Sequence, residues 1–178
     1  MRHKRHFFLD LETTGLDENT CFILEMGVKV TDVDYRVIDE FNIVVHQSRS
    51  RLRSMNAWCR KQHLKSGLIR ESQESLVSLT EAQHALLKWM DKHYFMSNVI
   101  LYGNSIHFDR KFIKKYLPLI EKRLSYRMVD ITSFKIVFET KFGVEVEKRD
   151  SEHRVLDDID DSINELKTYV KYITGGKK

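Results

Sequence analysis

The pattern of apolar and polar residues predicts strands in the first third of the chain. Three stretches rich in β-branched and aromatic residues are separated by short polar or acidic segments that suit turns. These stretches cover residues 6–12, 22–32 and 37–45. Consecutive strands with short connections usually pair with each other, so the pattern indicates an antiparallel meander of three strands.

The rest of the chain has mainly helical spacing. An amphipathic helix is expected over residues 80–94, with these apolar side chains near one face: Leu79, Ala82, Leu86, Trp89 and Met90. A last helix is expected from the 3-4-3-4-3 spacing of a core stripe: Leu156, Ile159, Ile163, Leu166, Val170 and Ile173. The other expected elements are helices at 51–62, 108–117 and 133–142 and short strands at 98–104 and 127–131. Pro118 is expected to close the helix at 108–117.

These elements predict one α/β domain. Strands come first and then alternate with helices, which indicates a mixed sheet (the antiparallel meander plus parallel strands) flanked by helices. No segment rich in glycine, serine or proline divides the 178 residues, a length typical of one domain. We therefore expect residues 1–178 to form a single domain, with loose ends at residues 1–5 and 174–178.

The composition narrows the class of protein. With 42% hydrophobic and 31% charged residues, the chain has the composition of a globular protein and not of a disordered one. No apolar run approaches the roughly 18 residues of a membrane span, so no membrane partner is expected. The apolar run near the start ends at Asp10, too early for a signal peptide. Two cysteines, Cys21 and Cys59, suggest neither a disulfide framework nor a zinc site, so the expected compartment is the cytoplasm.

The charge balance permits a polyanionic partner without establishing one. The formal net charge is +4 and the pI is about 9.0. The basic run RHKRH at residues 2–6 could contact phosphate, or it could be a solvated tail.

Several acidic residues stand where structure alone does not require them. Asp10 and Glu12 are two residues apart in the first strand, so they share one of its faces. Asp109 follows the strand at 98–104, and four more acids crowd the start of the last helix: Asp157, Asp158, Asp160 and Asp161. Each has a structural interpretation when taken alone. The first pair could lie on an exposed strand, and the others could favour helix N-termini or form a solvated face.

Taken together, these acids suggest a metal site. The ends of strands and the starts of helices in an α/β sheet can bring distant segments together, and converging carboxylates repel one another unless cations neutralise them. Hard oxygen ligands suit Mg²⁺ or Mn²⁺. Two such ions are typical of in-line attack on a phosphodiester, and a nearby histidine could act as general base. Helix geometry turns Asp157 and Asp161 away from the core stripe, whereas Asp158 and Asp160 flank it and both stay candidates.

Three motifs resemble the signature of DEDDh 3′–5′ exonucleases. They are FLDLETTGL at residues 8–16, GNSIHFDRKF at 103–112 and HRVLDD at 153–158. The final H-x4-D of this signature matches His153 and Asp158, which favours Asp158 over Asp160. Further segments are similar to the oligoribonuclease branch of the family, and the similarity covers nearly the whole chain. These segments are residues 45–68, 102–118 and 126–135.

The resemblance implies a fold, an activity and an assembly. The fold would be ribonuclease-H-like, and the chain would form a homodimer. The activity would be hydrolysis of very short single-stranded RNA from the 3′ end, with dinucleotides preferred and 5′-mononucleotides released. By position in the motifs, the ligands of two Mg²⁺ or Mn²⁺ ions would be Asp10, Glu12, Asp109 and Asp158. His153 would be the general base.

The resemblance also implies substrate-binding residues. Leu16 and His63 match residues that wedge or stack the bases, and Trp58 lies in the same matching segment. The residues that match a cap on the 5′ phosphate are Ser105, Arg127 and Thr132, with Tyr126 reaching in from the partner subunit. An arginine fork and hydroxyl groups suit a terminal phosphate. Structural alternatives are that Trp58 belongs to the core, that His63 lies on the surface, and that Tyr126 and Arg127 belong to a solvated basic run.

Two other functions stay open at this stage. One is a DEDDh exonuclease of the proofreading or RNA-trimming type, which acts on longer single strands. Thr13 is compatible with it, because this position often holds methionine in oligoribonucleases. The other is a non-catalytic nucleic-acid-binding module, in which the acids would be structural caps. The presence of all five catalytic-type residues favours an enzyme.

Overall fold

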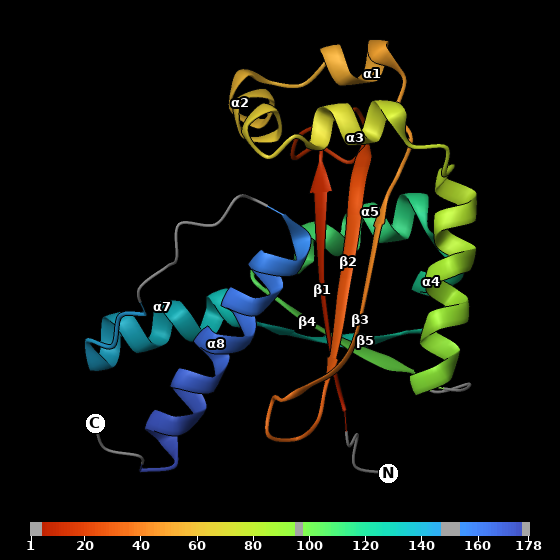
Figure 1. Cartoon of the computed structure of the whole chain (residues 1–178). Helices are drawn as coiled ribbons and strands as arrows, with labels where there is room; N and C mark the ends of the chain where they lie inside the picture. The colour runs from red at the N-terminus through yellow and green to blue at the C-terminus, as the bar shows by residue number, and fades with distance from the viewer. Residues whose placement is uncertain (1–4, 95–97, 147–153, 176–178) are drawn as a thin grey trace.

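The computed structural model describes residues 5–94, 98–146 and 154–175, and within them five strands form one mixed sheet (Figure 1). The strands are β1 (His6–Thr13), β2 (Ile23–Thr31), β3 (Val37–Val44), β4 (Val99–Gly103) and β5 (Leu124–Asp130). Their order across the sheet is β3-β2-β1-β4-β5. β2 pairs antiparallel with both β1 and β3, whereas β4 is parallel to β1 and β5. The expected meander and mixed sheet are therefore confirmed.

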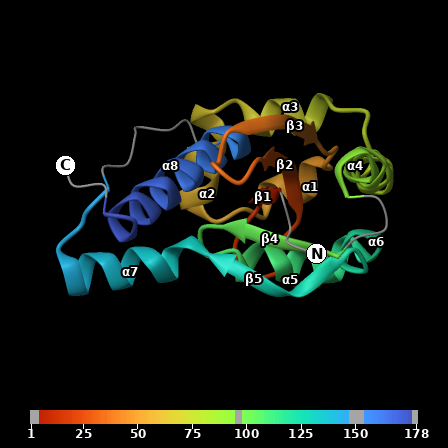
Figure 2. The same cartoon turned by 90° about the horizontal axis from the view of Figure 1, so that it is seen from below.

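Helices cover both faces and one end of the sheet (Figures 1 and 2). On one face lie α4 (Leu79–His93), α5 (His107–Tyr116) and the short α6 (Pro118–Glu121). On the other lie α7 (Ile131–Phe142) and α8 (Val155–Ile173). Three short helices gather where β1 ends and β2 begins: α1 (Arg49–Arg53), α2 (Ala57–Lys65) and α3 (Leu68–Glu74). No helix in the described part of the chain is long and apolar enough to cross a membrane.

Alternation along β1 determines where its carboxylates lie. Phe7, Leu9 and Leu11 point into the core beneath α4 and α5. Phe8 belongs to a separate core, which the sheet shares with α7 and α8. Because side chains alternate between the two faces of a strand, the residues at positions 10 and 12 lie on the same side as Phe8. The strand therefore directs two carboxylates toward α8.

The structure corrects several expected boundaries in the helical half of the chain. The single helix expected at 51–62 is two helices, because Asn56 caps α2 by accepting a hydrogen bond from the N–H of Cys59. The helices α3 and α6 were not expected. Pro118 does follow the end of α5, but it also begins α6, where its missing N–H costs nothing. Of the expected loose ends, residues 1–4 and 176–178 lie outside the described residues.

The apolar stripe expected on α8 is only partly correct. Its central residues Ile159, Ile163 and Leu166 are buried, but Ile173 is 65% exposed. The sequence analysis left out Val155 and Tyr169, which are fully buried. The helix changes partner along its length: its first half packs on β1 and β2, whereas near its end the Tyr169 ring stacks on Phe138 of α7. The buried face therefore has the expected spacing but lies slightly to one side of the expected stripe.

Candidate active site

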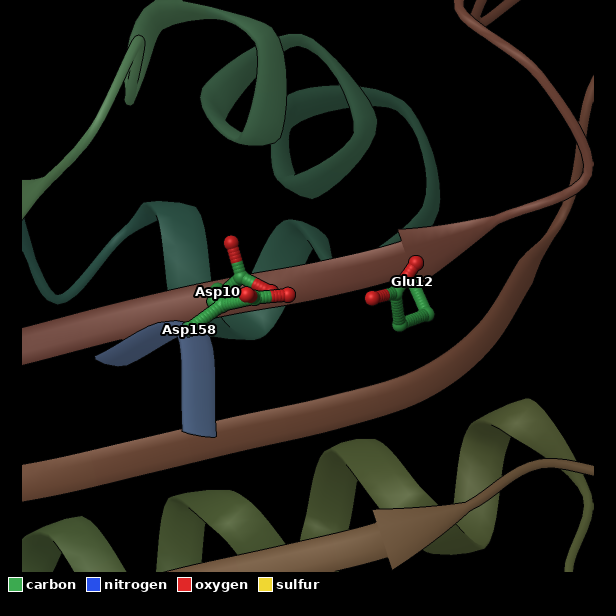
Figure 3. A group of neighbouring side chains, drawn as sticks. All are labelled: Asp10, Glu12 and Asp158. Atoms are coloured by element: carbon green, nitrogen blue, oxygen red, sulfur yellow. The ribbon is translucent and has the colours of Figure 1, made fainter. Parts of the chain in front are cut away.

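Three carboxylates converge at the end of β1 (Figure 3). Asp10 and Glu12 come from the strand, and Asp158 comes from the first turn of α8. Each offers an oxygen atom, and these oxygens all lie within 4.8 Å of one another. Asp160, the other residue that helix geometry allowed, accepts a hydrogen bond from Lys29 Nζ at 2.7 Å instead. The structure therefore favours Asp158, as the H-x4-D spacing does.

Asp109 adjoins this group from the opposite face of the sheet. It is a buried residue in the first turn of α5, which begins soon after β4 ends. Because β4 runs parallel to β1, both strands end at the same edge of the sheet. There Asp109 Oδ1 accepts a hydrogen bond of 2.9 Å from the N–H of Leu11, the residue between the two β1 carboxylates. The fourth expected acid is thus joined to the backbone of the site, whereas His153 lies outside the described residues.

The acids raise one another's pKa values because they are buried together. Burial and then the neighbouring carboxylates, Asp109 foremost, raise the pKa of Asp10 well above its usual value. The same causes, with Asp158 the foremost neighbour, raise the pKa of Glu12 to about 9. Burial raises the pKa of Asp109 to about 7. A cation bound by these carboxylates at neutral pH would therefore displace protons from them.

The donor set fits hard divalent cations. The converging ligand atoms are all carboxylate oxygens, which Mg²⁺ and Mn²⁺ prefer, and none comes from cysteine. Partly buried carboxylates at this spacing repel one another, and a cation removes that repulsion. The chemistry of the residues thus agrees with the divalent-ion site expected from the sequence.

One charged residue beside the site escaped the sequence analysis. Glu25 lies in β2 directly opposite Glu12 in the strand register, and it is fully buried. Its carboxylate receives two hydrogen bonds from the guanidinium of Arg154, at 2.7 and 3.0 Å. The available signal was a glutamate in the otherwise apolar first half of the strand, since a buried charge needs a partner.

The expected base-binding residues lie just after β1 and on α2, and they differ in exposure. Leu16 is 69% exposed and Trp58 is 61% exposed, so the interpretation of Trp58 as a core residue is wrong. His63 is buried, so its interpretation as a surface residue is also wrong. The Nε2 atom of His63 lies 2.9 Å from the carbonyl oxygen of Thr13 and 3.8 Å from Glu12 Oε2. α2 therefore packs directly against the end of β1.

The residues expected to cap a 5′ phosphate lie just after β4, within β5 and at the start of α7. Ser105 and Thr132 are in contact: the N–H of Ser105 donates to Thr132 Oγ1 at 2.9 Å, and the two hydroxyl oxygens are 3.1 Å apart. Ser105 adopts a φ of 48°, which is unusual for a residue other than glycine. Tyr126 and Arg127 are exposed on β5, with the guanidinium 5.0 Å from the ring centroid. The structure thus brings the two hydroxyls together and leaves the arginine accessible.

Comparison with known proteins gives the family. A model described as Exonuclease matches residues 7–166, and the chain belongs to that family. Within it the similarity is to oligoribonucleases. The chain is 39% identical to a probable oligoribonuclease of Dictyostelium discoideum, over 94% of the chain and 90% of the relative. It is 40% identical to the oligoribonuclease of Francisella tularensis subsp. novicida (strain U112), over 91% and 92%. Its identity to the mitochondrial oligoribonuclease of Homo sapiens is 37%, over 93% and 72%.

Solved structures support the same fold at much lower sequence identity. The zinc-bound complex of exonuclease I from Escherichia coli with single-stranded DNA superposes on 97% of this chain with a TM-score of 0.73 and 12% identity. Exonuclease I from Methylocaldum szegediense covers 94% of this chain with a TM-score of 0.71 and 14% identity. The chain spans about 40% of the length of these two proteins. Together the comparisons confirm the exonuclease fold and the expected family.

Proposed function

We propose that the protein is a 3′–5′ exoribonuclease that hydrolyses very short oligoribonucleotides, with dinucleotides preferred, to 5′-mononucleotides. The observation that carries the proposal is the convergence of Asp10, Glu12 and Asp158 in a chain whose relatives are oligoribonucleases. A non-catalytic binding module has no need to bury carboxylates against one another, because each adds repulsion and desolvation cost. The compartment we propose is the cytoplasm.

The metal ligands would be Asp10, Glu12, Asp109 and Asp158, which together could hold two Mg²⁺ or Mn²⁺ ions. Bound there, the ions would neutralise the phosphate and lower the pKa of the attacking water. Asp109 would take part while keeping its hydrogen bond to Leu11, because a carboxylate has a second oxygen free for a ligand role. His153 would accept the proton of the attacking water, a role that rests on its position in the H-x4-D motif alone.

The lip of the site would hold the bases. The exposed apolar side chains of Leu16 and Trp58 are available for contact with a nucleobase, and stacking on an aromatic ring is worth about 1–3 kcal/mol per base. We assign His63 a supporting role as well as base contact. Its ring is buried and joined to the carbonyl of Thr13, so it would fix the segment that carries Leu16.

A cap on the 5′ phosphate would set the length preference. Ser105 and Thr132 would offer their hydroxyl groups, and Arg127 would offer its guanidinium. The support is that the two hydroxyls are in contact and that Arg127 is accessible on β5. A phosphate bound by these groups would end the substrate there, so a longer strand would collide with the cap.

We further propose that the protein acts as a homodimer. β5 is the last strand of the sheet, and exposed apolar side chains lie on it and on α7: Tyr126, Met128, Ile136, Val137 and Phe142. A neighbouring group of exposed apolar residues on one face is typical of an interaction surface. A second copy that covers this face would bring Tyr126 of the partner subunit toward the 5′ end of the substrate.

The test is a length series of 5′-phosphorylated RNAs, from dinucleotide to 20-mer, with Mn²⁺ and then with EDTA. We expect mononucleotide release that requires the metal and is fastest for the shortest substrates. Faster turnover of the 20-mer would favour an exonuclease of the proofreading or trimming type. If no RNA in the series released mononucleotides in the presence of the metal, the binding module would be the better interpretation.

A further inference from the structure

The side chain of Arg154 joins three elements at the edge of the active site. Arg154 directly precedes α8, and its guanidinium uses one edge for each of two carboxylates. Its Nε and Nη2 atoms donate to Glu25 of β2 at 3.0 and 2.7 Å. Its Nη1 and Nη2 atoms donate to Glu71 of α3 at 3.0 and 2.8 Å. Such paired hydrogen bonds fix orientation as well as distance, so the start of α8 is held in two directions.

Arg154 with its partners Glu25 and Glu71, here called the clamp, lies one helical turn from Asp158, a candidate metal ligand. The N–H of Asp158 donates to the carbonyl of Arg154, so any shift of the clamp moves the Asp158 carboxylate with it. The Glu25 end of the clamp also adjoins the site, because Glu25 faces Glu12 across the β1–β2 ladder. The side chain of Glu25 is completely buried, which leaves little room for the pair to relax.

The packing of α8 on β2 leaves little space for the helix to shift. Gly27, the register partner of Asp10, has no side chain, and Val155 of α8 occupies the space above it. A Cβ atom on Gly27 would lie 2.5 Å from Val155 Cγ2. Further along, Lys29 binds Asp160 across the same interface. The helix is therefore in close contact with the strand on both sides of Asp158.

We propose that Arg154 is a positioning residue for the metal site: its double pairing with Glu25 and Glu71 holds α8 so that Asp158 meets Asp10 and Glu12. The inference rests on the proposed function, since it concerns the same carboxylates. In this role the geometry of the Arg154 guanidinium matters as well as its positive charge. A guanidinium can serve two carboxylates with fixed geometry, whereas a lysine ammonium at the same place is a point charge that cannot.

The test compares Arg154→Lys with the wild-type protein by calorimetric titration of Mn²⁺ into the metal-free protein, by thermal melting and by steady-state kinetics on a phosphorylated dinucleotide. We expect the variant to stay folded and to bind Mn²⁺ on the order of 10–100-fold more weakly, the usual loss when the support of a metal ligand is removed. We expect kcat to fall much more than KM rises. Mn²⁺ affinity equal to that of the wild type would overturn the proposal.

Arg123→Lys is the matched control. Arg123 is also partly buried and also pairs with a carboxylate, that of Asp91, but it lies in the connection between α6 and β5. We expect this variant to keep the wild-type Mn²⁺ affinity. An equal loss in both variants would show a general effect of weakening an ion pair and would refute the specific role of Arg154.

Two further variants complete the design. Arg154→Met combined with Glu25→Gln removes the charge and its partner together. If Arg154 positions α8, this pair of changes does not restore Mn²⁺ binding; full restoration would mean that Arg154 only neutralises Glu25, and the proposal would be wrong. Should Arg154→Lys not fold, Glu71→Gln loosens one side of the clamp at a partly exposed residue, with weaker Mn²⁺ binding expected and unchanged binding contradicting the proposal. A wild-type protein that neither binds Mn²⁺ nor hydrolyses the dinucleotide would instead refute the proposed function.

Discussion

The backbone N–H of Leu11 donates a hydrogen bond to Asp109 Oδ1 at 2.9 Å, across a sequence separation of 98 residues. This bond joins Asp109 to the backbone of the residue between the two carboxylates of β1. It also separates two roles of Asp109, because an asparagine can accept the same hydrogen bond without supplying a negative charge.

Asp109→Asn should therefore keep the fold and lose catalytic activity. We expect a loss of turnover on the order of 100-fold with the dinucleotide, because one ligand charge disappears from the metal site. The melting temperature without metal should stay the same or rise, since one member of a repelling group has been removed. Kinetics and thermal melting in EDTA check this, with Asp34→Asn on the exposed β2–β3 turn as control. Unchanged turnover in Asp109→Asn would remove Asp109 from the site.

Neighbouring acids on α8 should differ sharply in function. Asp158 belongs to the converging group, whereas Asp157 is exposed. We expect Asp158→Ala to abolish turnover and Asp157→Ala to leave it largely intact, as measured by mononucleotide release with Mn²⁺. Similar losses in the two variants would mean that the helix presents a different face to the site.

The raised pKa values give the metal-free protein a characteristic pH dependence. The folded-state pKa of Glu12, about 9, and that of Asp109, about 7, exceed the usual values of 4.5 and 3.8, so between these limits the folded state binds more protons than the unfolded state. Stability is then fully present at low pH and is lost as the pH rises toward 9. We expect the melting temperature in EDTA to fall over this range and Mn²⁺ to reduce the fall. In Glu12→Gln the fall should be smaller, and an unchanged slope would argue against this origin.

The local part of this site was predictable from sequence because it depends on spacing within one strand. Alternation alone placed Asp10 and Glu12 on one face, and the meander followed from three short apolar stretches. The choice between Asp158 and Asp160 was not accessible to helix geometry, since both flank the apolar stripe. What separates them in the structure is Lys29, a buried lysine on β2 that binds Asp160. Lys29 and Asp160 are far apart in the sequence, so their contact could not be predicted without the fold.

The features of the site that the sequence analysis missed depend on contacts between distant elements. Arg154 and Glu25 pair across 129 positions, and no local pattern encodes that pair. The exposure of Trp58 and the burial of His63 depend on how α2 packs against the end of β1, because the two residues lie on one short helix. By contrast, the break before α2 could have been predicted from the sequence, since Asn56 is a typical helix cap.

The proposed dimer can be tested on α7. Ile136 and Val137 are 56% and 52% exposed, and changing both to aspartate would place charges in the proposed interface. We expect the wild type to sediment as a dimer and this variant as a monomer with weak dinucleotide hydrolysis. Val33→Asp is the matched control, because Val33 is 58% exposed on the β2–β3 turn. A wild-type protein that sediments as a monomer at the assay concentration would rule out the dimer.

Gly27 offers the most direct test of how closely α8 must lie on the sheet. In Gly27→Ala the new methyl group would meet the Cγ2 and Cβ atoms of Val155 at 2.5 and 2.6 Å, which forces the start of α8 away from β2. We expect a destabilisation of about 1–3 kcal/mol, the usual cost of overpacking, and weaker Mn²⁺ binding because Asp158 moves with the helix. Adding Val155→Ala removes the nearer contact but keeps the Cβ atom, so it should restore stability and Mn²⁺ affinity only in part. Chemical unfolding and calorimetric titration measure the two effects. If Gly27→Ala lowered stability but left Mn²⁺ affinity untouched, the position of α8 would not control the metal site.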